Sequence, residues 1–207
     1  MAKFLKTTAA LTLAAAFFAV PASASDKSEL LHDANRTVDN LKHDPAFAQA
    51  ARMIEGARAV YIVPKLVKGG FIFGAEGGDG VLLVREGHSW SMPKFYGMGS
   101  ASFGLQIGLE QAELVFIINS ERALRGFEKG NVKIGVGAGL TVDNLSSDAE
   151  GATTTHGGDM VVWTSGSGAY AGISFNGSVI KADTDENAVP ATGPDAEALR
   201  HNLSTVS

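Results

Sequence analysis

Residues 63–80, VPKLVKGGFIFGAEGGDG, combine glycines with two lysines and raise the question of a phosphate-binding loop. A P-loop requires Gly-x-x-x-x-Gly-Lys-Ser/Thr before a helix, and a dinucleotide site requires Gly-x-Gly-x-x-Gly at a helix N-terminus. The stretch contains no such P-loop run, and its glycines lead into VLLVREG, which is short and β-branched. This pattern is typical of strands joined by turns. The sequence therefore predicts glycine-dependent strand bends rather than a nucleotide site.

Other motifs that could carry chemistry are incomplete. The run GHSWS at 87–91 approaches Gly-x-Ser-x-Gly, but Ser91 holds the last position and no helical pattern follows. The five histidines are scattered, with no pair at the spacing of helical zinc ligands. The run DTDEN at 183–187 resembles the start of a calcium loop, yet Ala188 and Pro194 replace its glycine and glutamate. We therefore predict no catalytic residue, no metal site and no cofactor.

Basic residues gather in one part of an acidic chain. The formal net charge is −5, which disfavours nucleic-acid binding because that affinity comes largely from phosphate neutralisation. The predicted site for an anionic lipid headgroup consists of Arg52, Arg58, Lys65, Lys68, Arg85 and Lys94. The alternative is that these side chains are simply solvated.

The N-terminus resembles an export signal. Lys3 and Lys6 precede an apolar run over residues 9–20 and the small residues Ala22-Ser23-Ala24. The run is shorter than the roughly 20 residues of a membrane-spanning helix, although a retained anchor is the alternative interpretation. The chain has no cysteine, which excludes disulfides and a cysteine-linked lipid anchor. We expect cleavage after Ala24 and a periplasmic or secreted protein that could lie peripherally on a membrane.

Two helices are predicted before the strands. Leu30, Leu31, Ala34, Val38 and Leu41 share one stripe of a helix over 27–42. A second helix begins near Pro45 and ends at Gly56. The apolar stripe of the first helix either packs on the sheet or enters a membrane interface.

Strand patterns dominate after residue 56. Short apolar runs cover 59–63, 70–75 and 80–84, and strict alternation over 132–143 predicts one long strand. Asn176-Gly177 predicts a hairpin turn, while Asn119 or Ser120 caps a short helix and residues 194–203 form another. The predicted fold is α+β, with the N-terminal helices packed on a curved, mainly antiparallel, glycine-rich sheet or partial barrel.

An ordered set of motifs resembles the SYLF domain family. It comprises Lys68-Gly69-Gly70-Phe71, Trp90-Ser91-x-Pro93, Ser102-x-Gly104-x-Gln106-x-Gly108 and the closing stretch GAYAGISFNGSVIKADTDENA at 168–188. The resemblance implies a phospholipid- or phosphoinositide-binding domain without catalytic activity. It also implies that an amphipathic N-terminal helix and basic residues contact lipid, and that some members bind actin.

These observations predict a signal peptide at 1–24, a SYLF-like lipid-binding domain at 25–193 and a C-terminal tail or short helix at 194–207. The predicted function is non-enzymatic binding of phospholipid or another anionic amphiphile at the cell envelope. The residues predicted to make apolar lipid contact are Leu30, Leu31, Val38, Leu41, Phe71 and Phe73. Two alternatives stay open: a structural module that docks an envelope protein, and an enzyme acting on envelope lipid or glycan, which would require His88, Glu76 and Asp79 to converge.

Overall fold

The computed structural model describes residues 24–70, 73–103, 108–135, 139–145, 158–165 and 175–206. The predicted signal peptide lies outside this range except for Ala24, where the first helix begins.

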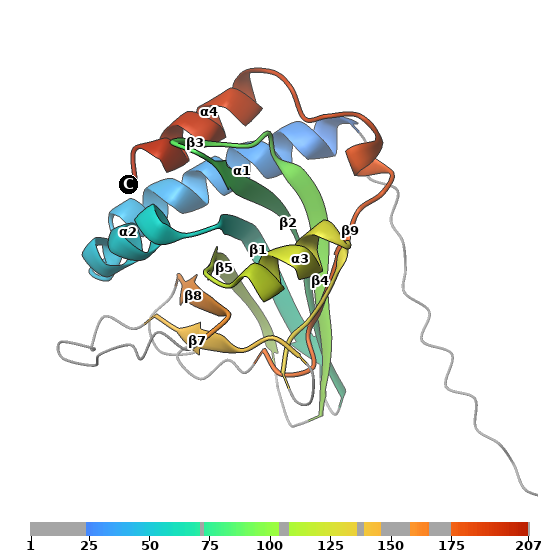
Figure 1. Cartoon of the computed structure of the whole chain (residues 1–207). Helices are drawn as coiled ribbons and strands as arrows, with labels where there is room; N and C mark the ends of the chain where they lie inside the picture. Colours follow the sequence, from blue (N-terminus) through green and yellow to red (C-terminus); the bar gives the residue numbers. More distant parts are fainter. Residues whose placement is uncertain are drawn as a thin grey trace, which may run out of the picture.

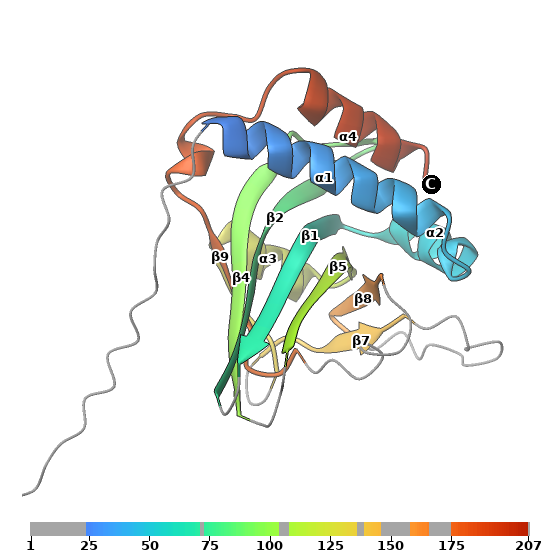
Figure 2. The same cartoon turned by 180° about the vertical axis from the view of Figure 1, so that it is seen from behind.

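A curled sheet forms the centre of the fold (Figures 1 and 2). Its strands are β1 (Ala59–Gly70), β2 (Phe73–Glu86), β3 (Ser89–Trp90), β4 (Lys94–Phe103), β5 (Gly108–Ile118), β6 (Asn131–Lys133), β7 (Val142–Asn144), β8 (Met160–Thr164) and β9 (Val179–Ala182). The spatial order is β6-β9-β4-β2-β1-β5-β8-β7, with β3 paired to β2. Only the β7–β8 pair of these strands is parallel, so the predicted α+β fold with a curved, mainly antiparallel sheet is confirmed.

Helices cover both faces of the sheet, as the two views show. They are α1 (Ala24–Lys42), α2 (Phe47–Gly56), α3 (Glu121–Glu128) and α4 (Pro194–Ser204), with a 3₁₀ turn at Glu186–Ala188. We call the side under α1, α2 and α4 the helix-covered face, and the side that holds α3 the inner face. Along β1, Val60 and Ile62 enter the core of the first, while Tyr61 and Val63 enter the core of the second. Burial on both faces explains why the central strands are continuous apolar runs.

The glycine-rich stretch forms two long strands instead of the short strands predicted. Ile62 is opposite Val81 whereas Val67 is opposite Gly77, so β1 carries an extra residue between them. Pro64 lies within this bulge, where a missing N–H is tolerated inside a sheet. A Cβ on Gly78 would lie 2.4 Å from the Lys65 carbonyl oxygen. Glycine is therefore required here because the bulged strand approaches the backbone of its neighbour.

The single strand predicted over 132–143 is wrong. β6 ends at Lys133, Gly135 adopts a φ of +108°, and Leu140 returns to bridge Ile134 before β7 begins. A Cβ on Gly139 would lie 2.4 Å from the Gly135 carbonyl oxygen, so glycine is needed where the two backbones approach, and the Ile134–Leu140 bridge is parallel. The alternation misled the prediction because Ile134 and Leu140 both reach the inner core.

The predicted helices are present, with small shifts at their ends. α2 starts at Phe47, because Asp44 Oδ1 accepts a hydrogen bond from the Ala46 amide at 2.8 Å and closes a turn before the helix. Ser120 caps α3 by accepting from the Ala123 amide. Pro194 opens α4, which packs on α1.

Candidate functional site

Two of the six predicted headgroup residues already have partners within the fold. Arg85 donates to the carbonyls of Ile54 at 2.5 Å and Ala57 at 3.0 Å, and its guanidinium lies 4.2 Å from the Trp90 ring centroid. Burial lowers the pKa of Arg85, with a small opposing effect of the Glu55 charge. Arg85 thus holds the end of α2.

Arg58 lies beside α3. Its Nη1 atom is 2.8 Å from Glu121 Oε2, and its Nε atom donates to the Asn119 carbonyl at 3.2 Å. Its side chain is about half exposed, at 48%. Arg58 is therefore linked to α3 by an ion pair with Glu121.

The structure does not bring the other four predicted cations together. Lys65 is exposed in the β1 bulge and lines a groove beside α1. The Cα of Lys68 lies in register between Glu76 and Glu110, and its side chain lies outside the described part. Arg52 on α2 and Lys94 at the start of β4 are exposed at separate places.

The predicted apolar contacts are mostly core residues. Leu31, Val38 and Leu41 are buried against the sheet, and Leu30 is half-buried beside them. Phe71 lies outside the described residues, as does the side chain of Phe73. Contact of the three buried residues with lipid would require α1 to leave the sheet.

Polar contacts also hold α1 in place. Thr37 is fully buried and donates to Glu113 on β5 at 3.0 Å. Asn40 donates to both carboxylate oxygens of the same glutamate at 2.9 Å. If α1 detached, the polar groups of Thr37, Asn40 and Glu113 would hydrogen-bond to water instead of to each other, and the apolar stripe of α1 would be exposed.

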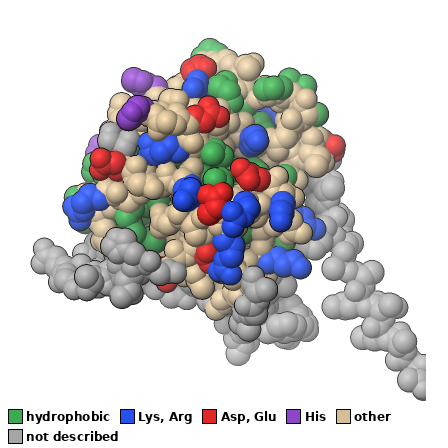
Figure 3. All heavy atoms as spheres, in the orientation of Figure 1, with side chains coloured by type: hydrophobic (Ala, Val, Ile, Leu, Met, Phe, Trp, Pro, Cys, Tyr) green, Lys and Arg blue, Asp and Glu red, His purple; other side chains and the backbone are tan. Residues whose placement is uncertain are grey.

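A basic surface forms instead on α3 and β6. Arg122, Arg125 and Lys129 follow one helical stripe, and exposed Lys133 lies on β6, the strand next to α3; we call these four residues the α3–β6 patch. Figure 3 shows Lys and Arg side chains gathered over this part of the molecule. The opposite side of α3 buries Ala123 and Phe127 in the inner core, which turns the cations outward.

Sequence reasoning missed this surface although its signal is present. The four cations are spaced by three or four residues in NSERALRGFEKGNVK, but acidic Glu121 and Glu128 interrupt the run. The structure shows that Glu121 sits between Arg58 at 2.8 Å and Arg125 at 3.5 Å. Glu121 therefore neutralises part of the patch through Arg125, and Asp159 likewise pairs with Arg122. Among the described residues, Lys129 and Lys133 are the patch cations without an ion pair.

Asp159 fixes the start of α3. It is 7% exposed, and it accepts from Ser120 Oγ at 2.6 Å, from the Thr141 amide at 3.0 Å and from Arg122. Burial opposes ionisation, but the hydrogen bonds from Arg122, Ser120 and Thr141 prevail and hold the pKa of Asp159 well below its ordinary value. The same ion pair fixes Arg122 in the patch.

The residues that an enzyme would need do not converge. Glu76 is buried on the inner face, where Ser100 Oγ donates to it at 2.6 Å. Asp79 instead lines the groove beside α1, and His88 is exposed in the turn between β2 and β3. Within the described residues, no three His, Asp or Glu side chains are grouped to hold a metal ion. None of the helices described there is long and apolar enough to cross a membrane.

Comparison with known proteins identifies the family. Residues 99–189 match the Ysc84 model, described as Las17-binding protein actin regulator. SH3 domain-containing YSC84-like protein 1 of Xenopus laevis is 37% identical over 119 residues, which cover 56% of this chain and 36% of that protein. These matches support membership of the SYLF domain family. The predicted resemblance is thereby confirmed.

Further relatives show how far this SYLF chain extends along longer proteins. Protein YSC84 of Saccharomyces cerevisiae is 31% identical over 140 residues, or 65% of this chain and 30% of that protein. The Rattus norvegicus YSC84-like protein 1 is 32% identical over 133 residues, or 63% of this chain and 39% of that protein. The SYLF chain thus spans about a third of the length of these curated relatives. No solved structure matches it.

Proposed function

We propose that this SYLF domain is a non-enzymatic binding domain that docks on an anionic lipid surface through the α3–β6 patch. The observation that carries the proposal is the presence of exposed Arg122, Arg125, Lys129 and Lys133 on α3 and the adjoining β6, in a chain whose net charge is −5. An acidic protein approaches an anionic membrane productively only with such a surface foremost.

The expected binding is weak and sensitive to salt. A Lys or Arg near an anionic membrane contributes roughly 1 kcal/mol, and the attraction decays over about 8–10 Å at physiological ionic strength. Glu121 and Glu128 on α3 reduce the net charge of the surface. A binding free energy of a few kilocalories per mole would hold the domain reversibly at a membrane.

The proposed place of action is the cell envelope. The predicted signal at residues 1–24 supports export, and removing it changes the formal charge from −5 to −7, because it contains two lysines and no acid. The ligand class follows from the compartment, since anionic phospholipid faces an exported protein at the membrane surface.

Vesicle co-flotation of residues 25–207 tests this function. Neutral vesicles are compared with vesicles containing anionic phospholipid, at low and high salt. We expect binding to anionic vesicles alone, lost at high salt. Reversal of Lys129 and Lys133 to glutamate should weaken binding at least about tenfold.

The matched control reverses Arg52 and Lys94, which are exposed but lie off the patch. It changes the total charge by the same amount and should bind nearly as well as the parent chain. Equal binding to neutral vesicles, or an equal loss in the control, would refute the proposal.

A protein partner is the second candidate. The printed description of the matching family names Las17 binding, and a Saccharomyces cerevisiae relative is named LAS seventeen-binding protein 3. The same patch would then meet an acidic protein surface. Failure to float with either vesicle, together with one envelope protein that binds the parent chain but not the Lys129/Lys133 reversal, would favour this function.

A further inference from the structure

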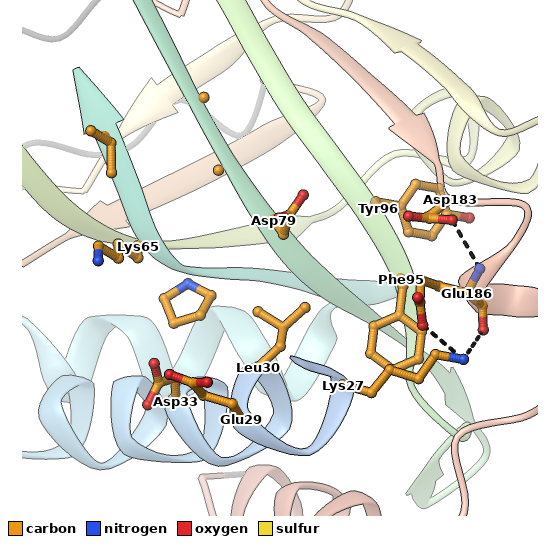
Figure 4. A pocket seen from close by; sticks show the side chains of 14 residues that line it. Lys27, Glu29, Leu30, Asp33, Lys65, Asp79, Phe95, Tyr96, Asp183 and Glu186 are labelled. Carbon is orange, nitrogen blue, oxygen red and sulfur yellow. Dashed lines mark hydrogen bonds and ion pairs between the residues drawn. The ribbon is translucent and has the colours of Figure 1, made fainter. Parts of the chain in front are cut away.

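A groove of about 510 Å³ lies between the first turns of α1 and the helix-covered face of the sheet (Figure 4). Glu29, Leu30 and Asp33 line it from α1. Lys65 and Asp79 line it from β1 and β2. Its volume falls within the roughly 300–1,000 Å³ of small-molecule sites.

The sequence creates this space with glycines. Gly77 on β2 has no side chain to fill the gap beneath α1, and Gly97 lies directly opposite Asp79 on β4. A Cβ on Gly97 would lie 3.4 Å from Asp79 Oδ1, so the carboxylate occupies the space over that glycine. The groove is therefore a consequence of residue choice at the sheet surface rather than of a poorly packed helix.

Most charges in the groove are already partnered. Lys27 lies 2.8 Å from Glu186 Oε2 and donates to the Glu186 carbonyl at 2.6 Å. Asp183 accepts the Glu186 amide at 2.9 Å, and Asp33 lies 3.2 Å from Arg36. These interactions are internal to the fold and leave little capacity for a ligand.

Asp79 differs from these groups. Its carboxylate makes no hydrogen bond or ion pair within the described part of the chain. Burial raises its pKa, and the charge of Asp183 raises it further. A cation placed beside Asp79 would relieve both effects.

The rest of the groove is apolar. Leu30 from α1 and Phe95 from β4 both line it, as Figure 4 shows, and Pro64 and Val67 add further apolar surface. A ligand that fits must therefore combine positive charge with an apolar body. An anion would meet five carboxylates and two lysines, one of which is paired with Glu186.

We propose that this groove binds a small organic cation, with its ammonium group beside Asp79 and its apolar body against Leu30 and Phe95. The site is separate from the α3–β6 patch, since the two lie on opposite faces of the sheet. The proposal therefore stands independently of membrane docking.

Titration calorimetry with hexylammonium tests the proposal, with hexanoate as the anionic probe of the same length. We expect saturable binding of hexylammonium and none of hexanoate. Asp79→Asn should weaken hexylammonium binding at least about tenfold, because a charged partner is replaced by a neutral one. Glu86→Gln, which removes an exposed carboxylate outside the groove, should leave binding unchanged.

The Gly97→Val variant distinguishes binding inside the groove from general attraction of the cation to surface carboxylates. It keeps every carboxylate but places methyl groups beside Asp79, so hexylammonium binding should be lost while the fold persists, as checked by circular dichroism. Retained binding in Gly97→Val, an equal loss in Glu86→Gln, or comparable binding of hexanoate would each overturn the proposal.

Discussion

At the scale of single residues, the most constrained charge is that of Asp159. Its carboxylate joins the start of α3 to the segment before β7 by hydrogen bonds from Ser120, Arg122 and Thr141. These hydrogen bonds hold the start of α3 beside the segment that contains Thr141. The sequence offered no signal for this, because Asp159 is separated from Ser120 by 39 positions.

Asp159→Asn should reduce the free energy of unfolding by about 2–4 kcal/mol, because the amide cannot accept from all these donors. Urea denaturation measures the loss. Glu86→Gln, at an exposed carboxylate, is the control and should change stability by less than about 0.5 kcal/mol. A similar small effect for both variants would show that the cluster is dispensable.

The contribution of Asp159 should also depend on pH. Its folded pKa lies below the unfolded value of about 3.9, so the carboxylate stabilises the fold fully above that pH. As pH falls below about 4, the unfolded state takes up the proton first and the stabilisation is lost progressively. The stability difference between the parent chain and Asp159→Asn should therefore be constant from pH 6 to 8 and shrink towards pH 3, unless the low pKa is incorrect.

Arg85 shows how a basic residue can be mistaken for a binding residue. Its guanidinium reaches two carbonyls at the end of α2 and stacks on Trp90, which lysine cannot reproduce. Arg85→Lys should cost about 1–2 kcal/mol of unfolding free energy, whereas Arg52→Lys at an exposed helical site should be close to neutral. Thermal unfolding of the two variants compares them directly, and equal melting temperatures would contradict this role.

At the scale of elements, the β1 bulge determines which side chains reach which face. The extra residue near Pro64 shifts the alternation of side chains between the two faces of the sheet. As a result, Lys65 faces the groove and Leu66 enters the inner core. The sequence predicted strands here, because apolar runs bounded by glycine identify them. It did not predict the bulge, which depends on pairing with β2 and β5.

Gly78→Ala tests this close approach. Its Cβ would lie 2.4 Å from the Lys65 carbonyl oxygen, and backbone cannot move aside cheaply, so we expect a loss of about 2–4 kcal/mol. Gly56→Ala, at the end of α2 with no atom within 4 Å of its Cβ, should be neutral or slightly stabilising. Chemical denaturation should separate the two variants clearly, and equal stability would mean that the bulge adapts.

The positions of the helices were easier to predict than the surfaces that the helices contact. The stripe of Leu31, Val38 and Leu41 identifies α1 correctly, but periodicity alone cannot tell a sheet from a membrane as the partner. The structure places this stripe against the sheet. The α3–β6 patch was missed because its cations become one surface only when β6 is placed beside α3.

At the scale of the whole molecule, charge is divided between the two faces of the sheet. The α3–β6 patch lies with α3 on the inner face, whereas the acidic groove lies under α1 on the helix-covered face. A domain docked through the patch would leave the groove open to solvent. Membrane docking and occupation of the groove should therefore be independent of each other.

The most direct test of membrane docking is hydrogen–deuterium exchange with and without anionic vesicles, read by peptide. The patch predicts slower exchange in peptides over 121–133 and unchanged exchange in peptides over 27–42, because α1 stays on the sheet. Faster exchange over 27–42, with no protection over 121–133, would show that α1 detaches to bind lipid and would contradict docking through the patch.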